Sequence, residues 1–248
     1  MLNAILNKYF SVEEGMGSKS ARAGHAYEEF VKSIFSNQGI VDNFNKCIAP
    51  HGIEEQIFYQ TCAQYNIDVI KSIEIVEVPL RDTGGPPKTD VCVKINDHVI
   101  KISVKQSSMS SIAVAEFDVD TIRKEIGITD KVLLDLMRKF QTDASGKNFD
   151  DDERESLRNR VAPVKEQLVR WTLSGSPDEY NEDLRIANHT IMFKVDHSTR
   201  DMKDFSTYTI EEQIKKITTR TSGYGTGLSW THASGTRGKK IQFKCPVL

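Results

Sequence analysis

The sequence predicts a mixed helix-and-strand protein of the α/β or α+β class. Apolar stripes at helical spacing and short runs of alternating apolar residues follow one another along the chain, and neither pattern dominates. The chain has 248 residues, which is enough for one well-cored domain, so we expect a single domain over residues 1–248. Hydrophobic residues make up 38% of the chain and charged residues 27%, as in ordinary globular proteins.

Composition also indicates the class of protein and the cellular location to expect. No apolar run approaches the roughly 20 residues that a membrane span needs. The four cysteines form no CxxC pair, and no His lies near them at metal-ligand spacing, so neither a zinc site nor a disulfide framework is expected. These features favour a reducing, cytoplasmic location.

The first part of the chain predicts three helices and a strand. The opening MLNAILNKYF has the spacing of an amphipathic helix, residues 19–37 predict a second helix that stops before Gly39, and residues 53–66 predict a third. The apolar runs over 69–80 are expected to form a strand. The apolar stripe of the second helix consists of Tyr27, Phe30, Val31, Ile34 and Phe35.

Two capped helices and a connection are expected next. Asp118 has the position of a cap for a short helix that ends at Gly127, and Thr129 has the position of a cap for the following helix. Residues 143–155, DASGKNFDDDERE, are expected to form an acidic, solvated connection.

The last third of the chain contains a kinked helix, a strand and a second capped helix. Residues 157–171 read as helical, with a break or kink at Pro163. Residues 191–195 alternate as in a strand, and residues 209–212 match a capping box that begins a helix. Residues 219–245 are rich in Gly, Ser and Thr and end in a short alternating run.

Charge is unevenly distributed. Residues 213–248 contain seven Lys or Arg and no Asp or Glu. The other residues carry 26 basic side chains (33 − 7) and 35 acidic ones, a net charge of −9. A basic terminal segment on an acidic body is typical of a polyanion-binding face, and a solvated surface segment is the alternative.

The segment TDVCVKINDHVIKISVK has the pattern of a β-hairpin. With Asn96-Asp97 at the turn, paired residue numbers sum to 193, so Asp90 lies opposite Ser103. Lys105 lies two residues further on, and therefore on the same face. The pattern gathers Asp90, Ser103 and Lys105 at the open end of the hairpin, opposite most of its apolar side chains.

An Asp beside a Lys at the end of a strand has a known chemical use. A carboxylate and a backbone carbonyl can hold Mg²⁺, while a lysine orients a water molecule or stabilises developing charge. An exposed salt bridge between Asp90 and Lys105 is the alternative. Glu28, at the edge of the apolar stripe of the 19–37 helix, either reaches a site beside the sheet or belongs to a solvated flank.

The C-terminal KKIQFK alternates cleanly. Lys240, Gln242 and Lys244 point to one side of the predicted strand, and Gln and Lys are side chains that read base edges in the DNA major groove. A loop with flexible glycines precedes them, and its polar side chains suit contacts with phosphates and bases. An ordinary edge strand with a polar outer face is the alternative. The loop donors are Thr231, His232, Ser234, Thr236 and Arg237.

Several segments together resemble the type II restriction endonucleases of the PD-(D/E)xK superfamily. The resemblance covers most of the chain from about residue 18 onward, in order, and is weakest over 40–80 and 174–208. The terminal block is its most specific part, because it is long and unusual in composition. The segments are AYEEF, GGPPKTDVCVKI, SVKQSS, AEFDVDTI, ITDKVLLDLMRKFQ and GYGTGLSWTHASGTRGKKIQFK.

The resemblance implies a fold and a reaction. The implied fold is a mixed central sheet flanked by helices, with a catalytic hairpin at about 88–106 and a DNA-recognition segment at about 219–245. The implied reaction is Mg²⁺-dependent hydrolysis of double-stranded DNA at the palindrome CCGG, cut after the first C to leave a 5′ overhang. A DNA methyltransferase of the same restriction system is the implied functional partner.

The resemblance also implies roles for single residues. Asp90 corresponds to the metal-binding carboxylate, Lys105 to the catalytic lysine and Glu28 to an outer acidic partner. Thr231, Ser234, Gln242 and Lys244 correspond to positions that contact the recognition bases.

Two positions depart from the pattern of the family. Most of the superfamily has Asp or Glu where this chain has Ser103, so we expect a single metal ion per site and keep open a DNA-binding protein that has lost its nuclease activity. Residues 113–115 are Ala-Val-Ala where a related enzyme has a DNA-contacting Ser, so a base preference other than CCGG is an alternative. A nuclease of the same fold that acts on RNA or on DNA structures is a third possibility.

Overall fold

The chain divides into two compact units. The computed structural model describes residues 1–10, 16–80, 87–179 and 181–247, so Gly84, Gly85 and Pro86 of the family-like hairpin segment lie outside the described residues. Unit 1 comprises Met1–Met109 and Asp183–Thr209, and unit 2 comprises Ser110–Glu182 and Ile210–Leu248. The expectation that residues 1–248 act as one endonuclease domain concerns function and stays a prediction.

Unit 1 contains a mixed five-stranded sheet. Its strand order is β1-β2-β3-β5-β6, and β3 and β5 run parallel whereas the other neighbours are antiparallel. Alternating β-branched residues explain why these segments form strands with one face in the core. The strands are β1 (Ile73–Val76), β2 (Val91–Ile95), β3 (His98–Ser107), β5 (His189–Val195) and β6 (Met202–Thr209).

Among the described residues, four helices belong to unit 1. They are α1 (Leu2–Phe10), α2 (Met16–Phe35), α3 (Gln38–Asn45) and α4 (Ile53–Gln64). The apolar stripe predicted for the second helix is confirmed, since all five of its side chains are at most 1% exposed. Helix α3 was not predicted: Asn37 Oδ1 accepts a hydrogen bond of 2.9 Å from Gly39 N, so Gly39 lies inside a new helix instead of ending the previous one.

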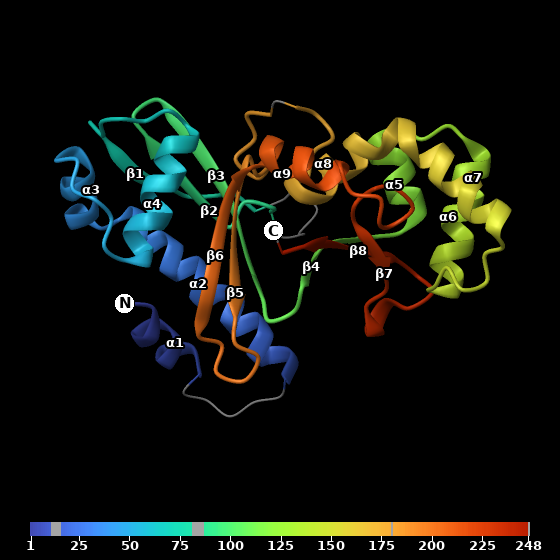
Figure 1. The fold of residues 1–248 in the computed structure, drawn as a ribbon, viewed down its shortest axis with the longest axis horizontal. Coiled ribbons are helices and arrows are strands. Elements are labelled where there is room, and N and C mark those ends of the chain that lie inside the picture. The colour runs from blue at the N-terminus through green and yellow to red at the C-terminus, as the bar shows by residue number, and fades with distance from the viewer. Residues whose placement is uncertain (11–15, 81–86, 180, 248) are drawn as a thin grey trace. The chain divides into compact units, whose positions relative to one another are not determined.

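Helix α2 covers the sheet of unit 1. Figure 1 shows α2 crossing behind β5 and β6, and the ring of Tyr27 lies 4.6 Å from the ring of Phe193 on β5. Tyr27, Phe30 and Phe193 are fully buried in the core that α2 shares with the strands. This packing holds the inner face of the β2–β3 hairpin rigidly, so the hairpin can present its open end in a fixed position.

One buried histidine lies in the same unit. His189 at the start of β5 is 0% exposed, and its Nε2 lies 2.6 Å from Thr207 Oγ1. Its Nδ1 is buried without a hydrogen-bond partner among the described residues. Burial lowers the pKa of His189 to about 3, so the ring is neutral at physiological pH.

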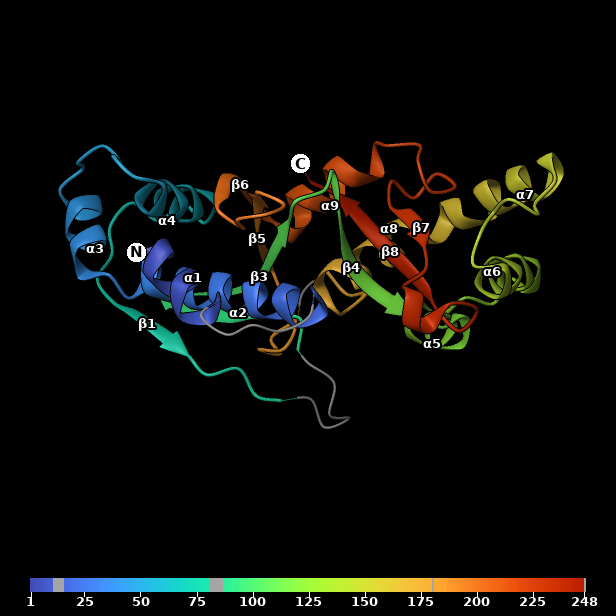
Figure 2. The same ribbon diagram turned by 90° about the horizontal axis from the view of Figure 1, so that it is seen from below.

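Unit 2 contains a three-stranded antiparallel sheet with the order β4-β8-β7. The strands are β4 (Ser111–Phe117), β8 (Ile241–Pro246) and β7 (Ser229–Thr231). Figure 2 shows β8 lying between its two neighbours. β4 contains an irregularity between Ala113 and Ala115, which leaves Val114 as an extra residue.

The helices of unit 2 correct two predictions. Asp130, not Thr129, caps the second helix, because its Oδ1 accepts hydrogen bonds from Val132 N and Leu133 N. Residues 143–155 are not wholly a solvated connection, because a capping box of Asp150 and Glu153 begins a helix within them. The helices are α5 (Val119–Ile126), α6 (Lys131–Asp143), α7 (Asp151–Val161), α8 (Lys165–Ser174) and α9 (Ile210–Thr218).

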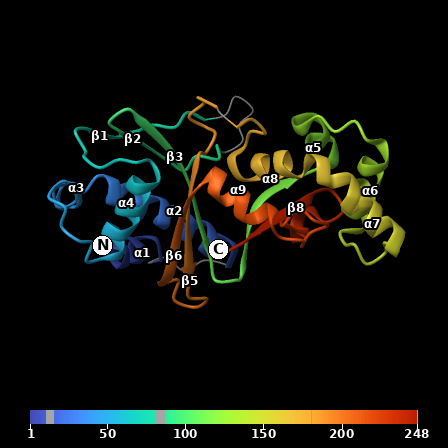
Figure 3. The ribbon, with the colours of Figure 1, turned by 45° about the horizontal axis from the view of Figure 1, so that its top comes forward.

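Other predictions for unit 2 are confirmed. Asp118 caps α5, and Gly127 ends it with a φ of 70°. The predicted break at Pro163 is a 3₁₀ turn, Ala162–Val164, between α7 and α8. Figure 3 shows α8 beside α9, and the buried Arg170 joins them through a hydrogen bond of 2.8 Å to Glu211 Oε2.

Within the described ranges, none of the helices combines the length and the apolar character that crossing a membrane requires.

Candidate functional site

The predicted register of the β2–β3 hairpin is confirmed. Val91 pairs with Ile102 and Ile95 pairs with His98, so each pair sums to 193. Asp90 N extends the ladder by donating a hydrogen bond of 2.8 Å to Ile102 O. The turn is held in place by Asn96, whose side chain binds the segment that precedes β1. Asp90 therefore lies immediately before β2 in a fixed position, directly beside Ser103.

The structure brings Asp90, Ser103 and Lys105 into one group, the hairpin cluster. Asp90 Oδ2 accepts hydrogen bonds from Val104 N at 2.7 Å, from Lys105 Nζ at 3.0 Å and from Ser103 Oγ at 3.4 Å. The side chains of Lys105 and Asp90 are 22% and 19% exposed. The carboxylate is thus oriented by a strand amide and an ammonium group at once, which fixes its rotamer far better than one exposed salt bridge would.

The ammonium of Lys105 lies where a hard cation fits. Nζ donates to Asp90 Oδ2 at 3.0 Å and to Val104 O at 2.9 Å, so one positive group bridges a carboxylate and a backbone carbonyl. Carboxylate and carbonyl oxygens are the ligands that Mg²⁺ and Ca²⁺ prefer. Asp90 Oδ1 has no hydrogen-bond partner among the described residues. These residues therefore fit a divalent cation that keeps several of its own water ligands.

The hairpin cluster is poor in negative charge. Among the described residues, no group of three or more His, Cys, Asp or Glu side chains could hold a metal ion. Asp90 is the only acidic side chain that the cluster contributes. This donor set is consistent with one cation and offers little to a second.

The outer face of the hairpin is less exposed to solvent than the sequence suggested. Ser103 and Cys92 are each 1% exposed and Lys101 is 5% exposed, although all three lie on the face opposite the main core. Lys101 Nζ donates to Asp183 O at 3.1 Å, which brings a later segment of unit 1 over this face. Burial raises the pKa of the Cys92 thiol. Ser103 therefore supports Asp90 from inside the fold.

Glu28 is not joined to the hairpin cluster by any hydrogen bond among the described residues. It lies on α2, its side chain is 28% exposed, and its Oε2 lies 3.2 Å from His25 Nδ1 one turn earlier. Its assignment as an outer acidic partner stays a prediction.

The alternation predicted for the C-terminal strand is confirmed. Ile241, Phe243 and Cys245 are fully buried, whereas Gln242 and Lys244 on the opposite side are half-buried. The alternative of an edge strand is wrong, because β8 has β4 on one side and β7 on the other. A central strand already has partners for its backbone groups, so its polar side chains are not needed to block edge pairing.

Pairing across the sheet of unit 2 defines two rows of outward side chains. Lys244 is flanked by Ser229 on β7 and Ala113 on β4. Gln242 is flanked by Thr231 on β7 and Glu116 on β4. We call these six residues the polar face. Thr231, Gln242 and Lys244 were predicted to bind DNA. The sequence did not predict Glu116 on this face, because only the strand register places it there.

The remaining predicted recognition residues follow β7 directly. Ser234 lies in a 3₁₀ turn, Ser234–Thr236, while Arg237 and Lys240 are exposed in the connection to β8. His232 is half-buried, and its Nδ1 has no hydrogen-bond partner among the described residues. Exposed donors on a short connection between two paired strands suit contacts with an anionic partner.

The glycine-rich segment before β7 is closely packed. Gly223 and Gly227 adopt φ values of 56° and 81°, and a Cβ at Gly227 would lie 2.0 Å from Ile217 O. The Thr226 hydroxyl accepts a hydrogen bond of 3.2 Å from Trp230 Nε1, and Trp230 packs in turn on Phe243 of β8. The glycines allow close backbone packing next to β7, and this packing supports the polar face from the opposite side of the sheet.

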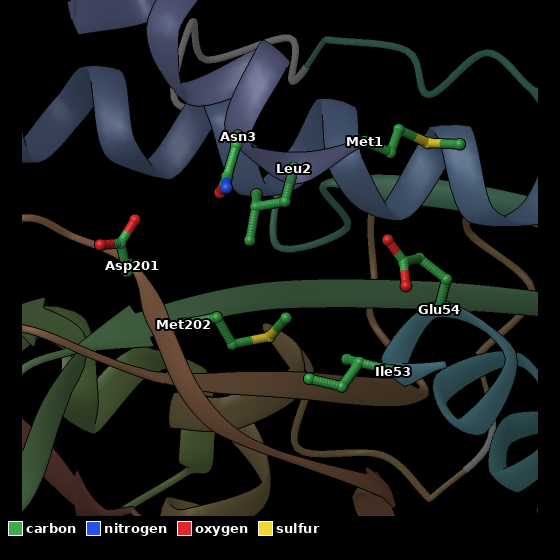
Figure 4. A pocket seen from close by; sticks show the side chains of 7 residues that line it. All are labelled: Met1, Leu2, Asn3, Ile53, Glu54, Asp201 and Met202. Carbon is green, nitrogen blue, oxygen red and sulfur yellow. The ribbon is translucent and has the colours of Figure 1, made fainter. Parts of the chain in front are cut away.

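A separate pocket of about 470 Å³ lies between α1, the start of α4 and the start of β6. Figure 4 shows the carboxylates of Glu54 and Asp201 among its lining side chains, together with two methionines. None of the predicted site residues lines it. Its two carboxylates make its lining acidic.

Comparisons with known proteins agree over almost the whole chain. The family model described as restriction endonuclease MspI matches residues 4–245. The type II restriction enzyme MspI of a Moraxella species is 33% identical over 246 residues, with 92% of this chain and 91% of that protein covered. A crystal structure of restriction endonuclease MspI in complex with its cognate DNA matches with a TM-score of 0.83 and 27% identity, covering 98% of this chain and 97% of that one. The hairpin cluster and the polar face thus belong to a protein of the MspI family of type II restriction endonucleases.

Proposed function

We propose that this endonuclease hydrolyses one phosphodiester bond in each strand of double-stranded DNA at CCGG, after the first C, with Mg²⁺ as its metal ion. The hairpin cluster carries the proposal, because Asp90 and Lys105 lie 3.0 Å apart in a site whose oxygen donors fit a hard cation. The relative of known structure was crystallised with its cognate DNA, which supports a duplex as the partner. The family model spans parts of both units, which supports residues 1–248 as one endonuclease domain.

Asp90 would hold the ion through its free Oδ1, together with the carbonyl of Val104. Bound there, Mg²⁺ supplies Lewis-acid polarisation of the phosphate and favours hydroxide formation from water. The amide of Val104 and the hydroxyl of Ser103 keep the carboxylate in its rotamer. Glu28 is assigned a weaker role as an outer acidic partner, on the family pattern alone.

Lys105 acts on the reacting groups directly. Its ammonium sits at the same edge of the hairpin as Asp90, and Lys is a mobile point charge with three donors. It orients the attacking water or stabilises the charge that develops on the phosphate oxygens. Because the cluster supplies one carboxylate, we propose a single protein-held ion per site. Two fully occupied protein-held ions in a crystal structure with DNA would contradict this.

The polar face and the connection after β7 would read the DNA. Lys244 suits the O6 and N7 acceptors of guanine, and Gln242 offers both a donor and an acceptor on the same face. Thr231 and Ser234 provide hydroxyl groups for base contacts, whereas His232, Arg237 and Lys240 suit phosphates. A DNA methyltransferase of the same restriction system would protect the host DNA.

The testing experiment is digestion of a plasmid of known sequence, with Mg²⁺ and with EDTA, followed by sequencing of the ends. Mg²⁺-dependent ends within CCGG, carrying a two-base 5′ overhang, are expected. Discrete ends at another sequence would keep the chemistry and reject CCGG. An Asp90→Asn variant should leave the plasmid intact under both conditions, which excludes a contaminating nuclease.

The second candidate is a sequence-specific DNA-binding protein with lost or weak nuclease activity. Ser103 favours it, because the position that holds Asp or Glu in most of the superfamily is occupied here by a buried hydroxyl. Specific duplex binding without cleavage in Mg²⁺ or Mn²⁺ would support this candidate over the first. Competition between duplex DNA and duplex RNA of the same sequence separates both from an RNA-directed nuclease.

A further inference from the structure

Glu116 is the one acidic side chain of the polar face. Its Cα pairs with that of Gln242, and Gln242 pairs on its other side with Thr231. The extra residue in β4 explains how it comes to lie there: Ala113 and Glu116 are three positions apart, yet both point to the same side as Lys244 and Gln242. Without the bulge, strict alternation would place Glu116 and Ala113 on opposite faces.

The carboxylate of Glu116 is held toward the recognition connection. Thr236, in the 3₁₀ turn after β7, donates its hydroxyl to Glu116 Oε1. Glu116 forms no ion pair with any Lys or Arg among the described residues, and its Oε2 has no hydrogen-bond partner there. The residue is half-buried, so part of its surface remains open to an incoming group.

An acidic group on a DNA-binding face needs a physical reason. A carboxylate repels phosphate, and each such contact opposes the attraction that Lys and Arg provide. A carboxylate is favourable only where it accepts hydrogen bonds from a base amino group. In the major groove, those donors are N4 of cytosine and N6 of adenine.

Resting on the proposed function, we propose that Glu116 is a specificity-determining residue that accepts a hydrogen bond from the N4 amino group of a cytosine in the target. In a site made only of G·C pairs, cytosine N4 is the only donor that the major groove offers. Lys244 can read guanine but can accept nothing, and the amide of Gln242 and the hydroxyl groups of the polar face can donate as well as accept. Glu116 is the one side chain of the polar face that can only accept, so it is the one that favours a cytosine over a guanine. It lies in the row next to Lys244, with Thr236 fixing the orientation of its carboxylate.

The test uses duplexes in which one cytosine of CCGG is replaced by a 2-pyrimidinone nucleoside, which lacks the N4 amino group. Each cytosine position is replaced in turn, and dissociation constants are measured with Ca²⁺ so that nothing is cut. For the wild type, one position should weaken binding roughly 10- to 100-fold, the usual size of a lost base-edge contact. Glu116→Ala should bind unmodified CCGG more weakly than the wild type does, by a similar factor. Replacing the cytosine at that position should not weaken the binding of this variant any further.

Three variants separate base reading from a role in positioning. Glu116→Gln keeps the shape of the side chain and one acceptor, so it should retain part of the discrimination. It serves as the test variant if Glu116→Ala folds poorly. Thr236→Val removes the internal hydrogen bond and should leave the dependence on N4 in place. Glu125→Gln, an exposed residue of α5, removes the same charge elsewhere in unit 2 and should behave as the wild type.

The outcomes distinguish the two levels of the argument. A wild type that prefers CCGG, combined with a Glu116→Ala variant that still loses affinity when N4 is absent, overturns the role of Glu116 alone. Binding of unmodified CCGG by Glu116→Ala at wild-type strength also overturns it. A wild type without preference for CCGG over a scrambled duplex of equal composition overturns the proposed target, and the cytosine assignment with it.

Discussion

The hairpin cluster and the polar face are both built on paired strands, but their side chains are held in different ways. Asp90 accepts three hydrogen bonds from neighbours on β3, and Lys105 donates to two oxygens. The side chains of Gln242 and Lys244, by contrast, form no hydrogen bond with any described residue. The proposed catalytic side chains thus bind one another, whereas two of the proposed base-reading side chains have no protein partner among the described residues. Unsatisfied donors and acceptors discriminate well, because a wrong base leaves them unpaired in the complex.

The largest effect is expected when the ammonium of the hairpin cluster is removed, which tests whether cleavage and binding depend on different groups of side chains. Lys105→Ala should lower the cleavage rate by roughly 10²- to 10³-fold or more, as expected for a group that stabilises the transition state. Specific binding in Ca²⁺ should change little, because the polar face is untouched. Single-turnover cleavage and binding titrations check the two halves of this expectation.

Lys94→Ala is the matched control, since Lys94 is an exposed lysine on the same hairpin. It should cleave at the wild-type rate. An equal loss of binding and cleavage in Lys105→Ala would remove Lys105 from its chemical role.

The second prediction tests the support beneath the polar face. Gly227→Ala places a methyl group 2.0 Å from Ile217 O and forces a φ of 81° on an alanine. We expect the free energy of unfolding to fall by more than about 2 kcal/mol, from the clash and the strained backbone together. Urea unfolding followed by tryptophan fluorescence measures it.

Gly235→Ala is the internal comparison, because nothing lies within 4 Å of a Cβ built there. It should change stability by less than about 0.5 kcal/mol. Equal stability of both variants would show that the glycine-rich segment is loose after all.

The third prediction sharpens the division inside the recognition segment. Lys244→Ala should cost roughly 1–3 kcal/mol of discrimination between CCGG and a single-base variant, as a base-edge contact does. Lys240→Ala should weaken binding to all duplexes alike and reduce the salt slope by about 1, as a phosphate contact does. If both variants lost specific and non-specific binding in parallel, neither lysine would read a base.

The smallest effect concerns acid stability and the sheet that carries the hairpin. The folded chain holds His189 neutral down to a pKa of about 3, whereas the ordinary value is 6.5. Between these values the unfolded chain binds one more proton, so stability is lost as the pH falls, by about 1.4 kcal/mol per pH unit from this residue. Urea unfolding of the wild type and of His189→Asn at pH 7.5, 6.5 and 5.5 isolates this slope. A slope unchanged by the substitution would assign the acid sensitivity to other groups.

Sequence patterns within one element predicted the features that short-range spacing determines. The hairpin register followed from a two-residue turn between alternating strands, and the stripe of α2 followed from helical spacing. Thr129 and Asp130 are both good caps, and only the structure decides which hydroxyl or carboxylate reaches the free amides. The beginning of α7 was missed because its many charged residues look like a solvated linker, although Asp150 and Glu153 form a capping box.

Contacts between distant segments could not be predicted in the same way. Lys101, on the same face of the hairpin as Ser103, binds Asp183 O about eighty positions later, and no spacing rule connects them. Glu116 reaches the polar face through a bulge, which breaks the two-residue period used to assign faces. The packed state of the glycine-rich segment depends on Ile217, at the end of another element.

The bridge that Lys105 makes between Asp90 and Val104 has one more consequence. A bare carboxylate beside an approaching phosphate would repel it, but here the carboxylate carries its own resident counter-ion. Duplex binding in EDTA should therefore persist in the wild type and weaken in Lys105→Ala, where Asp90 is left uncompensated. On the proposed function, Lys105 would let the protein bind duplex DNA before a metal ion is bound, so that binding and cutting are separate events.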